Sequence, residues 1–594
     1  MTINTDAPRF SRIYVRDDGL GMSYETLSRL VKSIGGSAKR HNEGTELGIT
    51  SQHDTTLTPG GRPIIGKIGI GLFSVSQLAR RFRIVTKMRG EPYRLVAEIQ
   101  LRQFEEGAVD DGDDSTLSGV VTITREGTSE LQAHGTDILL DDIKPPVRDI
   151  LRDAERWRAV ENREAAEANG DVDEARQYNI QAPVFHAGWI GGSLKSAGQP
   201  IELSRPPRLP WTDETPGSER IQALMRGVED QSASYRRPDL DTTLDYYLGM
   251  VWSLGLAAPV PYIDGHPFDL TAEAGIRLFW LSNRQKEPAT PVEMLPGQTV
   301  REAISASAPG RPQLVDGLHH PAGEFRVSID DIELRRPVSF KLRRTSDRGL
   351  DHSILMVGRY APDLSPVADG QSGGALALEG YLFWNGRIIP KENNGVLVRI
   401  RGASGSLFDR SFFSYAVQET TRLSQITSEL FVQHGLDAAL NIDRESFNFA
   451  HPHFQLVSAW LHRALRQLTN RQKEMSARLR DVRSADLSAT ARSAVSDFAQ
   501  SVWDRRQGSE PPPEVEFVDN AAEADDRRRS GASAFTRSEF ATLDAKGGQD
   551  RENREARAAA VLQILTAYGA LENLSLDDQR SLADEILHVF MEIK

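Results

Sequence analysis

A glycine-rich segment at residues 64–87 constrains the fold of this chain more than any other stretch. It reads IIGKIGIGLFSVSQLARRFRIVTK, and its glycines Gly66, Gly69 and Gly71 precede apolar residues at helical spacing. Glycines let backbone N–H groups approach an anion closely, and the first turn of a helix offers unpaired N–H donors. The segment therefore predicts a loop that leads into a helix and holds a phosphate group.

The residues upstream strengthen this interpretation, because a glycine cluster alone usually marks only a turn. Ile13 and Val15 alternate with polar residues, as on a half-buried strand, and the sequence continues DDGLGM from Asp17 onwards. Asp17 is therefore expected to end a strand, where its carboxylate can accept a hydrogen bond from an adenine amine. Gly19 and Gly21 leave room for the base.

Three motifs in this order resemble those of the GHKL ATPases, which include gyrase, the 90-kDa heat-shock chaperones, histidine kinases and MutL. DDGLGM resembles the family's adenine-binding DxGxGM, GKIGIGLFS its second glycine motif, and HGTDI at residues 134–138 the strand that closes the pocket. The match is closest to the heat-shock chaperones and their bacterial form, HtpG. The resemblance implies an α+β fold, with a GHKL-type α/β sandwich, an α/β middle domain like ribosomal protein S5, and a helical C-terminal region.

The resemblance also implies which residues bind the nucleotide, and it implies ATP and Mg²⁺ as cofactors. The residues that match are Asp17, Gly19, Gly21, Met22, Ser37, Gly66, Lys67, Gly69, Ile70, Gly71, Leu72 and Thr136. Residues 22–65 are expected to form a lid over ATP. The lid departs from the family at Leu30 and Gly36, where the chaperones carry an asparagine and a lysine, and Lys39 and Lys67 are the candidates for the missing cation.

A second match lies in the middle of the chain. GLDAALNIDRESFNF, at residues 435–449, resembles the chaperone segment whose arginine reaches into the ATP site, and Arg444 takes that arginine's place. A guanidinium offers a planar fork of donors that suits a γ-phosphate, so the resemblance implies Arg444 as the catalytic residue. The alternative is a surface pair between Arg444 and Glu445, which contributes almost nothing. Asn448 stands where the family has a glutamine.

One family element is expected to be missing. In the family, a helix before the first motif carries a glutamate that activates water and an asparagine that binds Mg²⁺, whereas sixteen residues precede Asp17 here. The true start could lie upstream, hydrolysis could be inefficient, or another segment could substitute. Glu516 and Asn520 have the required ExxxNA spacing, but the proline-rich and charged flanks favour an acidic disordered linker there.

Length and composition bound the remaining expectations. A chain of 594 residues predicts several domains. The expected parts are a nucleotide-binding domain at 1–145, an exposed, charged helical linker at 146–182, a middle domain at 183–460, a helical region at 461–505, a disordered linker at 506–551 and a helical module at 552–594. A net charge of −13 argues against general polyanion binding, and the lack of cysteines excludes disulfides and thiolate sites. The absence of long apolar runs and of a signal pattern predicts a soluble, cytoplasmic chain.

Three functions stay open at this point. The leading hypothesis is a chaperone-like ATPase, in which ATP closes the lid and changes the conformation of a homodimer that binds client proteins. The alternative is a non-chaperone GHKL switch that acts on a partner protein in DNA-related or defence machinery. The third is a nucleotide-binding scaffold with weak or no hydrolysis. Basic residues at 335–344 and 463–483 are expected to be solvated faces rather than nucleic-acid sites.

Overall fold

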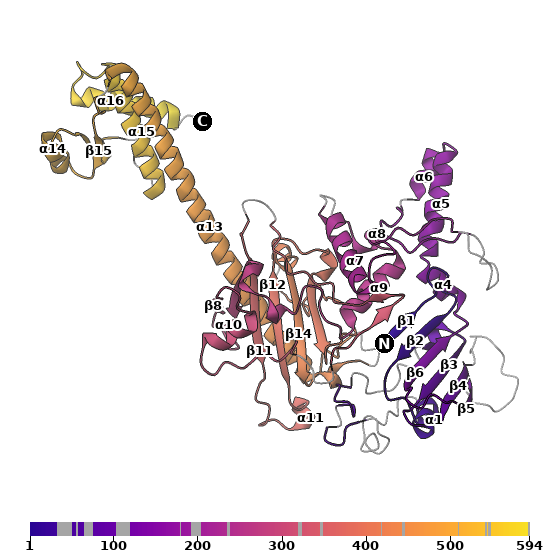
Figure 1. Cartoon of the computed structure of the whole chain (residues 1–594). Coiled ribbons are helices and arrows are strands. Elements are labelled where there is room, and N and C mark those ends of the chain that lie inside the picture. The colour runs from indigo at the N-terminus through magenta and orange to yellow at the C-terminus, as the bar shows by residue number, and fades with distance from the viewer. Residues whose placement is uncertain are drawn as a thin grey trace. The chain divides into compact units, whose positions relative to one another are not determined.

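The computed structural model divides the chain into two compact units, Met1–Arg471 and Gln472–Lys594, which are described separately below (Figure 1). The residues that the structure describes are 1–32, 50–54, 57–64, 75–101, 119–178, 180–191, 203–233, 238–318, 323–344, 349–416, 419–441, 446–508, 510–540, 543 and 548–591. Within the described residues, no helix has an 18-residue stretch apolar enough to cross a membrane.

The first unit contains an eight-stranded sheet with the strand order β10-β9-β1-β2-β6-β3-β4-β5. Its strands are β1 (Thr2–Asn4), β2 (Ile13–Asp17), β3 (Arg81–Lys87), β4 (Tyr93–Leu101), β5 (Gly119–Gly127), β6 (Gly135–Leu140), β9 (Ser328–Ile329) and β10 (Ile332–Glu333). All neighbours run antiparallel except β1 and β9, which are parallel. The predicted end of β2 at Asp17 is confirmed, and β6 forms where the HGTDI motif predicted a strand.

Short helices lie against this sheet, and their apolar sides form its core. They are α1 (Tyr24–Lys32), α3 (Val75–Leu78) and α4 (Pro145–Leu151). Leu27 of α1 is fully buried in one cluster with Ile84 and Ala97, and Met22 and Val75 pack against the same cluster. The residues directly after the first motif and those that begin α3 therefore rest on one core.

Helices follow the first sheet in the chain. They are α5 (Ala154–Ala168), α6 (Val172–Gln177), α7 (Gly217–Ser232), α8 (Leu240–Thr243) and α9 (Tyr246–Ala257). The predicted helix at 146–182 is present, but the expectation that it is an exposed linker is wrong for one face. Trp157 is 1% exposed and stacks on Trp189, with ring centroids 6.3 Å apart. These two residues form an apolar face that the charged composition of the segment did not predict.

A second, six-stranded sheet has the order β13-β14-β12-β11-β7-β8. Its strands are β7 (Ile276–Trp280), β8 (Thr290–Val292), β11 (Ser353–Tyr360), β12 (Ala377–Trp384), β13 (Gly395–Ile400) and β14 (Ile426–His434). Accompanying helices are η2 (Pro267–Asp269), η3 (Ala272–Ala274), α10 (Val300–Ser307), α11 (Asp369–Ser372), η4 (Lys391–Asn393), α12 (Thr420–Leu423) and η5 (Asp437–Ala439). β12 and β13 follow each other in the chain, but β14 pairs between them.

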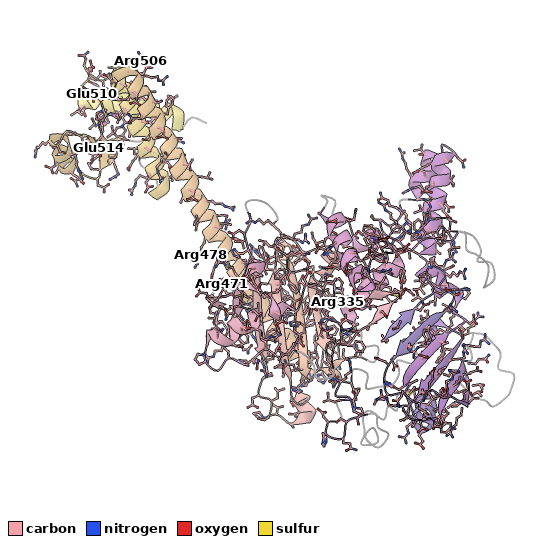
Figure 2. All side chains as sticks on the ribbon, viewed as in Figure 1. Arg335, Arg471, Arg478, Arg506, Glu510 and Glu514 are labelled. Atoms are coloured by element: carbon pink, nitrogen blue, oxygen red, sulfur yellow. The ribbon has the colours of Figure 1, made fainter. Side chains whose placement is uncertain are left out.

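The long helix α13 (Pro452–Gln507) belongs to both units, since the boundary falls within it. No residue of α13 from 470 to 498 is buried, and the side chain of Arg478 projects from this stretch (Figure 2). The helical prediction for 461–505 is confirmed. So is the pair of helices at the C-terminal end, α15 (Gly548–Ala567) and α16 (Leu576–Met591).

The predicted disordered linker at 506–551 is wrong over much of its length. β15 (Val515–Val518), α14 (Ala521–Arg529), β16 (Ser533–Thr536) and η6 (Arg537–Glu539) form there, and β15 pairs with β16 in parallel. The reason is a small aromatic core. The rings of Phe517, Phe535 and Phe540 contact one another, and all three side chains are buried together with apolar residues of α15 and α16.

Candidate functional site

The candidate site lies where three neighbouring strands of the first sheet end. The register pairs Asp17 of β2 with Thr136 of β6, and Thr136 in turn with Thr86 of β3. Cross-strand partners place their side chains on the same face of a sheet, so one carboxylate and two hydroxyls lie in a row. Thr86 is 1% exposed, whereas Asp17 and Thr136 are partly exposed. The row therefore runs from the core to a surface that a ligand can reach.

Asp17 combines a structural contact with an available acceptor. Its Oδ1 accepts a hydrogen bond of 2.8 Å from the backbone N–H of Gly19, which fixes the turn that follows the strand. No described residue donates a hydrogen bond to the other carboxylate oxygen. A carboxylate has lone pairs on both oxygens, so Oδ2 can accept from a donor outside the protein.

Thr86 organises the neighbouring hydroxyls. Its Oγ1 accepts from the N–H of Met22 at 2.9 Å, lies 3.3 Å from the carbonyl oxygen of Gly135, and lies 3.2 Å from Oγ1 of Thr136. A hydroxyl has one hydrogen and two lone pairs. When Thr86 donates to the carbonyl of Gly135, Thr136 must donate to Thr86. The lone pairs of Thr136 then remain for an outside donor, beside the carboxylate of Asp17.

Two glycines let the backbone segments of the site approach each other. Gly21 has φ +75°, and a Cβ there would lie 1.9 Å from the carbonyl oxygen of Lys87. Gly135 has φ +127°, and its Cβ would lie 2.2 Å from the carbonyl oxygen of Asp17. Residues with a side chain rarely adopt such φ values, and no side chain fits at these separations. Both motifs therefore need their glycine for close backbone packing.

His134 connects the turn after β2 to the segment after β3. Its Nδ1 lies 2.8 Å from the carbonyl oxygen of Gly19, and its Nε2 lies 2.7 Å from Nη2 of Arg89. A carbonyl can only accept, so Nδ1 carries the hydrogen and Nε2 accepts from the guanidinium. This tautomer is neutral, and it holds the turn that carries Gly19 against the end of β6.

Several other polar groups of these strands have partners within the protein. Arg16 lies 3.7 Å from Asp137, its cross-strand partner. Burial, followed by the hydrogen bond and the charge of Asp137, raises the pKa of Tyr14. The amine of Lys87 donates to the carbonyl oxygens of Met88 and Glu91 at 3.2 and 2.7 Å. Among the described residues, nothing donates to the second carboxylate oxygen of Asp17, which stays available beside Thr136.

The structure brings together five of the predicted site residues: Asp17, Gly19, Gly21, Met22 and Thr136. The other predicted site residues, Ser37, Gly66, Lys67, Gly69, Ile70, Gly71, Leu72 and Arg444, lie outside the described residues. So does Lys39. Thr86 and His134 were not predicted as site residues. Thr86 lies near the end of the segment at 64–87, and only the register of β3 with β6 places it beside Thr136.

The described residues on either side of Arg444 pair with each other, and the pairs Leu440–Phe447 and Asn441–Ser446 are called the hairpin base below. Leu440 and Phe447 form an antiparallel bridge, and the backbone N–H of Asn441 donates to the carbonyl oxygen of Ser446 at 3.0 Å. The amide of Asn441 also donates to the hydroxyl of Ser446 at 2.8 Å. Residues 442–445 connect these two partners.

The predicted basic cluster at 335–344 is largely paired. Arg343 lies 2.9 Å from Glu229, and Lys341 lies 3.6 Å from the same carboxylate. Arg335 lies 3.3 Å from Glu333. These contacts place acidic partners beside the cations of this cluster.

No group of three or more His, Asp or Glu side chains that could hold a metal ion occurs in the described part of the chain. Glu516 lies in β15 and pairs with Arg527 at 3.3 Å, whereas Asn520 caps α14 by accepting from the N–H of Glu523 at 2.8 Å. Glu516 and Asn520 therefore do not share one helical face, and they do not form the Glu/Asn pair of the family helix.

Comparisons with known proteins give limited matches. No protein-family model matches the chain. A segment of 77 residues is 32% identical to chaperone protein HtpG of Streptomyces coelicolor, which is 13% of this chain and 11% of that protein. The chain thus spans about a tenth of the length of this curated relative.

Two solved structures of the ATPase region of Saccharomyces cerevisiae topoisomerase II are also similar, one of them bound to ICRF-187 (dexrazoxane). Each has a TM-score of 0.26 and 9% sequence identity, over 80% of this chain and 79% of the other.

Proposed function

We propose that this chain binds ATP at the strand ends of the first sheet and works as a GHKL-type nucleotide switch. One observation carries the proposal: the available carboxylate oxygen of Asp17 lies in a row with the hydroxyls of Thr136 and Thr86, between two close backbone approaches at glycine. This arrangement offers two neighbouring acceptors. The 6-amino group of adenine has two N–H donors, and these match the two acceptors.

Each residue of the row has a separate task in this proposal. Asp17 accepts from the adenine amine with the oxygen that the turn does not use. Thr136 accepts from the second N–H of the amine or from a bridging water. Thr86 stays buried and orients Thr136, while its contact with the N–H of Met22 holds the start of the next segment. A hydrogen bond to a charged acceptor is stronger than one between neutral groups, so Asp17 supplies most of the specificity.

The phosphates belong, in this proposal, to the glycine-rich segment of 65–74. Its described neighbours support this assignment, because Val75 packs on the same core as Met22. Backbone N–H groups of Gly66, Gly69 and Gly71 would bind the phosphates, with Lys67 as a nearby cation. Mg²⁺ would then accompany the phosphates of ATP and neutralise part of their charge.

The proposal extends from ATP binding to ATP hydrolysis. Arg444 would contact the γ-phosphate from the hairpin at 440–447 and stabilise the charge of the transition state. The HtpG match supports a chaperone variant of this function, in which ATP changes the conformation of a homodimer that binds client proteins. The alternative variants are a switch that acts on a partner in DNA-related or defence machinery, and a scaffold that does not hydrolyse ATP.

Calorimetric titration with ATP and ADP tests nucleotide binding directly. We expect the wild type to bind and Asp17→Asn to lose at least about 2 kcal/mol of binding free energy, roughly thirtyfold in Kd. Asp18→Asn is the matched control, since Asp18 is the exposed neighbour of Asp17. Equal affinity in Asp17→Asn and the wild type contradicts the assignment.

The variants of the function separate in two further assays. Suppression of client aggregation that depends on ATP supports the chaperone variant. DNA binding that weakens steeply with salt supports the switch in DNA-related machinery. ATP binding without measurable phosphate release supports the scaffold.

A further inference from the structure

A tight turn that carries Arg401 follows β13. Ile400 and Ala403 exchange two backbone hydrogen bonds, of 2.9 and 3.2 Å, around Arg401 and Gly402. Both central residues have positive φ, +54° and +78°. Two positive φ values are typical of a type I′ turn, which an arginine adopts at a cost in conformational energy. An arginine held in this unfavourable backbone conformation suggests that its side chain has a function.

Buried charges hold this turn in place. Arg399, at the end of β13, is fully buried, and its Nε donates to Glu429 at 2.7 Å while Nη1 donates to the carbonyl of Leu256 at 2.7 Å. Nη2 of Arg336 donates to the carbonyl of Gly402 at 2.7 Å. Arg336 is 6% exposed and lies over the ring of Tyr262 at 4.8 Å. The backbone that carries Arg401 is therefore anchored on both sides.

The side chain of Arg401 contacts two segments that are far apart in the sequence. Nη1 donates to the carbonyl oxygen of Ile64, and Nη2 pairs with Asp437 at 3.0 Å. The Arg401 side chain is 13% exposed, so these contacts are sheltered from water. Ile64 is the first residue of the glycine-rich segment at 64–87, and Asp437 begins η5, which leads into the hairpin base at Leu440.

The base of this hairpin does not pack tightly on the strand beside it. A cavity of about 210 Å³ lies between the end of β13 and the hairpin, with Ile400 and Ser404 on one side and Leu440 and Phe447 on the other. The packing towards β13 is therefore incomplete, whereas the ring of Phe447 contacts those of Phe413 and Phe454. The ion pair between Asp437 and Arg401 connects this segment, through Arg401, to Ile64.

We infer that Arg401 is a positioning residue that couples residues 437–441, which lead into the hairpin base, to the segment at 57–64. The planar guanidinium binds both acceptors at once, so a displacement of either segment is transmitted to the other. This inference rests on the proposed function for its effect on turnover, because the hairpin carries Arg444. The link between the two segments itself does not depend on nucleotide.

The test compares Arg401→Ala, Arg401→Lys and Asp437→Asn with the control Arg410→Ala. Arg410 is a more exposed arginine of the same region, with 55% of its side chain accessible. We expect Arg401→Ala to lower kcat for ATP hydrolysis about a hundredfold, as for other lost positioning contacts, with less than a threefold change in KM. Arg401→Lys should stay at least about tenfold below the wild type, because one ammonium does not span both acceptors.

The two partners should act as one unit. The double variant Arg401→Ala/Asp437→Asn should lose no more turnover than Arg401→Ala alone, since both changes break the same link. Arg410→Ala should match the wild type. Wild-type kcat in Arg401→Ala, full rescue by lysine, or an equal loss in Arg410→Ala would overturn the inference.

Hydrogen exchange provides a readout that does not need hydrolysis. In nucleotide-free protein, Arg401→Ala should exchange faster in peptides covering both 57–64 and 437–441, whereas Arg410→Ala should not. If the wild type binds no ATP, the proposed function fails, and this exchange experiment still decides the link. A change in one segment without the other shows that Arg401 does not couple them.

Discussion

Gly135→Ala is the change that most sharply tests the geometry of the strand ends. The added Cβ would lie 2.2 Å from the carbonyl oxygen of Asp17, where real Cβ contacts do not fall below 3.0 Å. Asp17 or the end of β6 must therefore move by at least about 0.8 Å. The atom in contact is backbone, so no flexible side chain can rotate away. The register between Asp17 and Thr136 then has to distort.

The cost follows from two contributions. Alanine at φ +127° adopts a conformation that is nearly restricted to glycine, which costs about 1–3 kcal/mol. Overpacking against a rigid neighbour costs about another 1–3 kcal/mol. We expect a loss of about 2–6 kcal/mol in the free energy of unfolding of the first sheet. The shift of Asp17 should also raise the Kd for ATP at least about tenfold, since each tenfold corresponds to about 1.4 kcal/mol.

Two glycine variants separate the causes. Gly127→Ala meets no atom within 4 Å and has no positive φ, so its effect should stay within about 0.5 kcal/mol. Gly90→Ala also meets open space but has φ +87°, so it should show the backbone cost without the loss of ATP affinity. Calorimetric melting, ATP titration and hydrogen exchange of peptides covering 13–22 and 135–140 measure these effects. A Gly135→Ala protein that melts and binds ATP like the wild type would refute the reasoning.

Three further outcomes are expected. Glu429→Gln should lower the free energy of unfolding in urea by about 3–5 kcal/mol, because Arg399 loses its buried charged partner. The double variant Glu429→Leu/Arg399→Met should lose far less, because it removes both charges. Equal losses in the two proteins would contradict a stabilising charge pair. Burial lowers the pKa of His186 to about 4, so the stability contributed by the neutral side chain should be lost as the pH falls from 6.5 towards 4. In melting experiments at several pH values, His186→Gln should therefore show a smaller change of stability with pH. In the same window Asp245, whose pKa burial raises to about 6, acts in the opposite direction, and an unchanged pH profile in His186→Gln would show that another group dominates. Arg444→Ala should lower ATP turnover about a thousandfold while ATP affinity by calorimetry stays near wild type, and an equal loss of both would remove the catalytic role.

The local elements of the first sheet could be predicted because their signals are local. Alternation of apolar and polar residues marked β2, and the run DDGLGM marked its end at Asp17. The glycine at 135 and the threonine after it lay at the start of a recognisable strand. These patterns depend on neighbouring residues alone, so they survive in a single sequence.

Contacts between distant residues could not be predicted in the same way. β9 joins β1 from more than 300 residues away, through a pairing of only two residues. Thr86 became part of the site through the register of β3 with β6, and Arg401 through contacts to Ile64 and Asp437. Sequence patterns carry no information on such distances, which depend on how the sheets fold together.

The failure at 506–551 has a different cause. Proline and charged residues dominate its composition, which is typical of disorder. Phe517, Phe535 and Phe540 are spaced too irregularly to show a helical or strand period. They form a core only with α15 and α16, so composition concealed a folded segment.

The ratio of the Kd values for GTP and ATP, compared between the wild type and Asp17→Asn, tests the central assignment most directly. Guanine carries a carbonyl where adenine carries its amine, so the carboxylate of Asp17 would face an acceptor. The wild type should therefore prefer ATP by about a hundredfold or more. An asparagine amide can donate to that carbonyl, so the ratio in Asp17→Asn should fall below about ten. The same ratio in both proteins would show that Asp17 does not read the base.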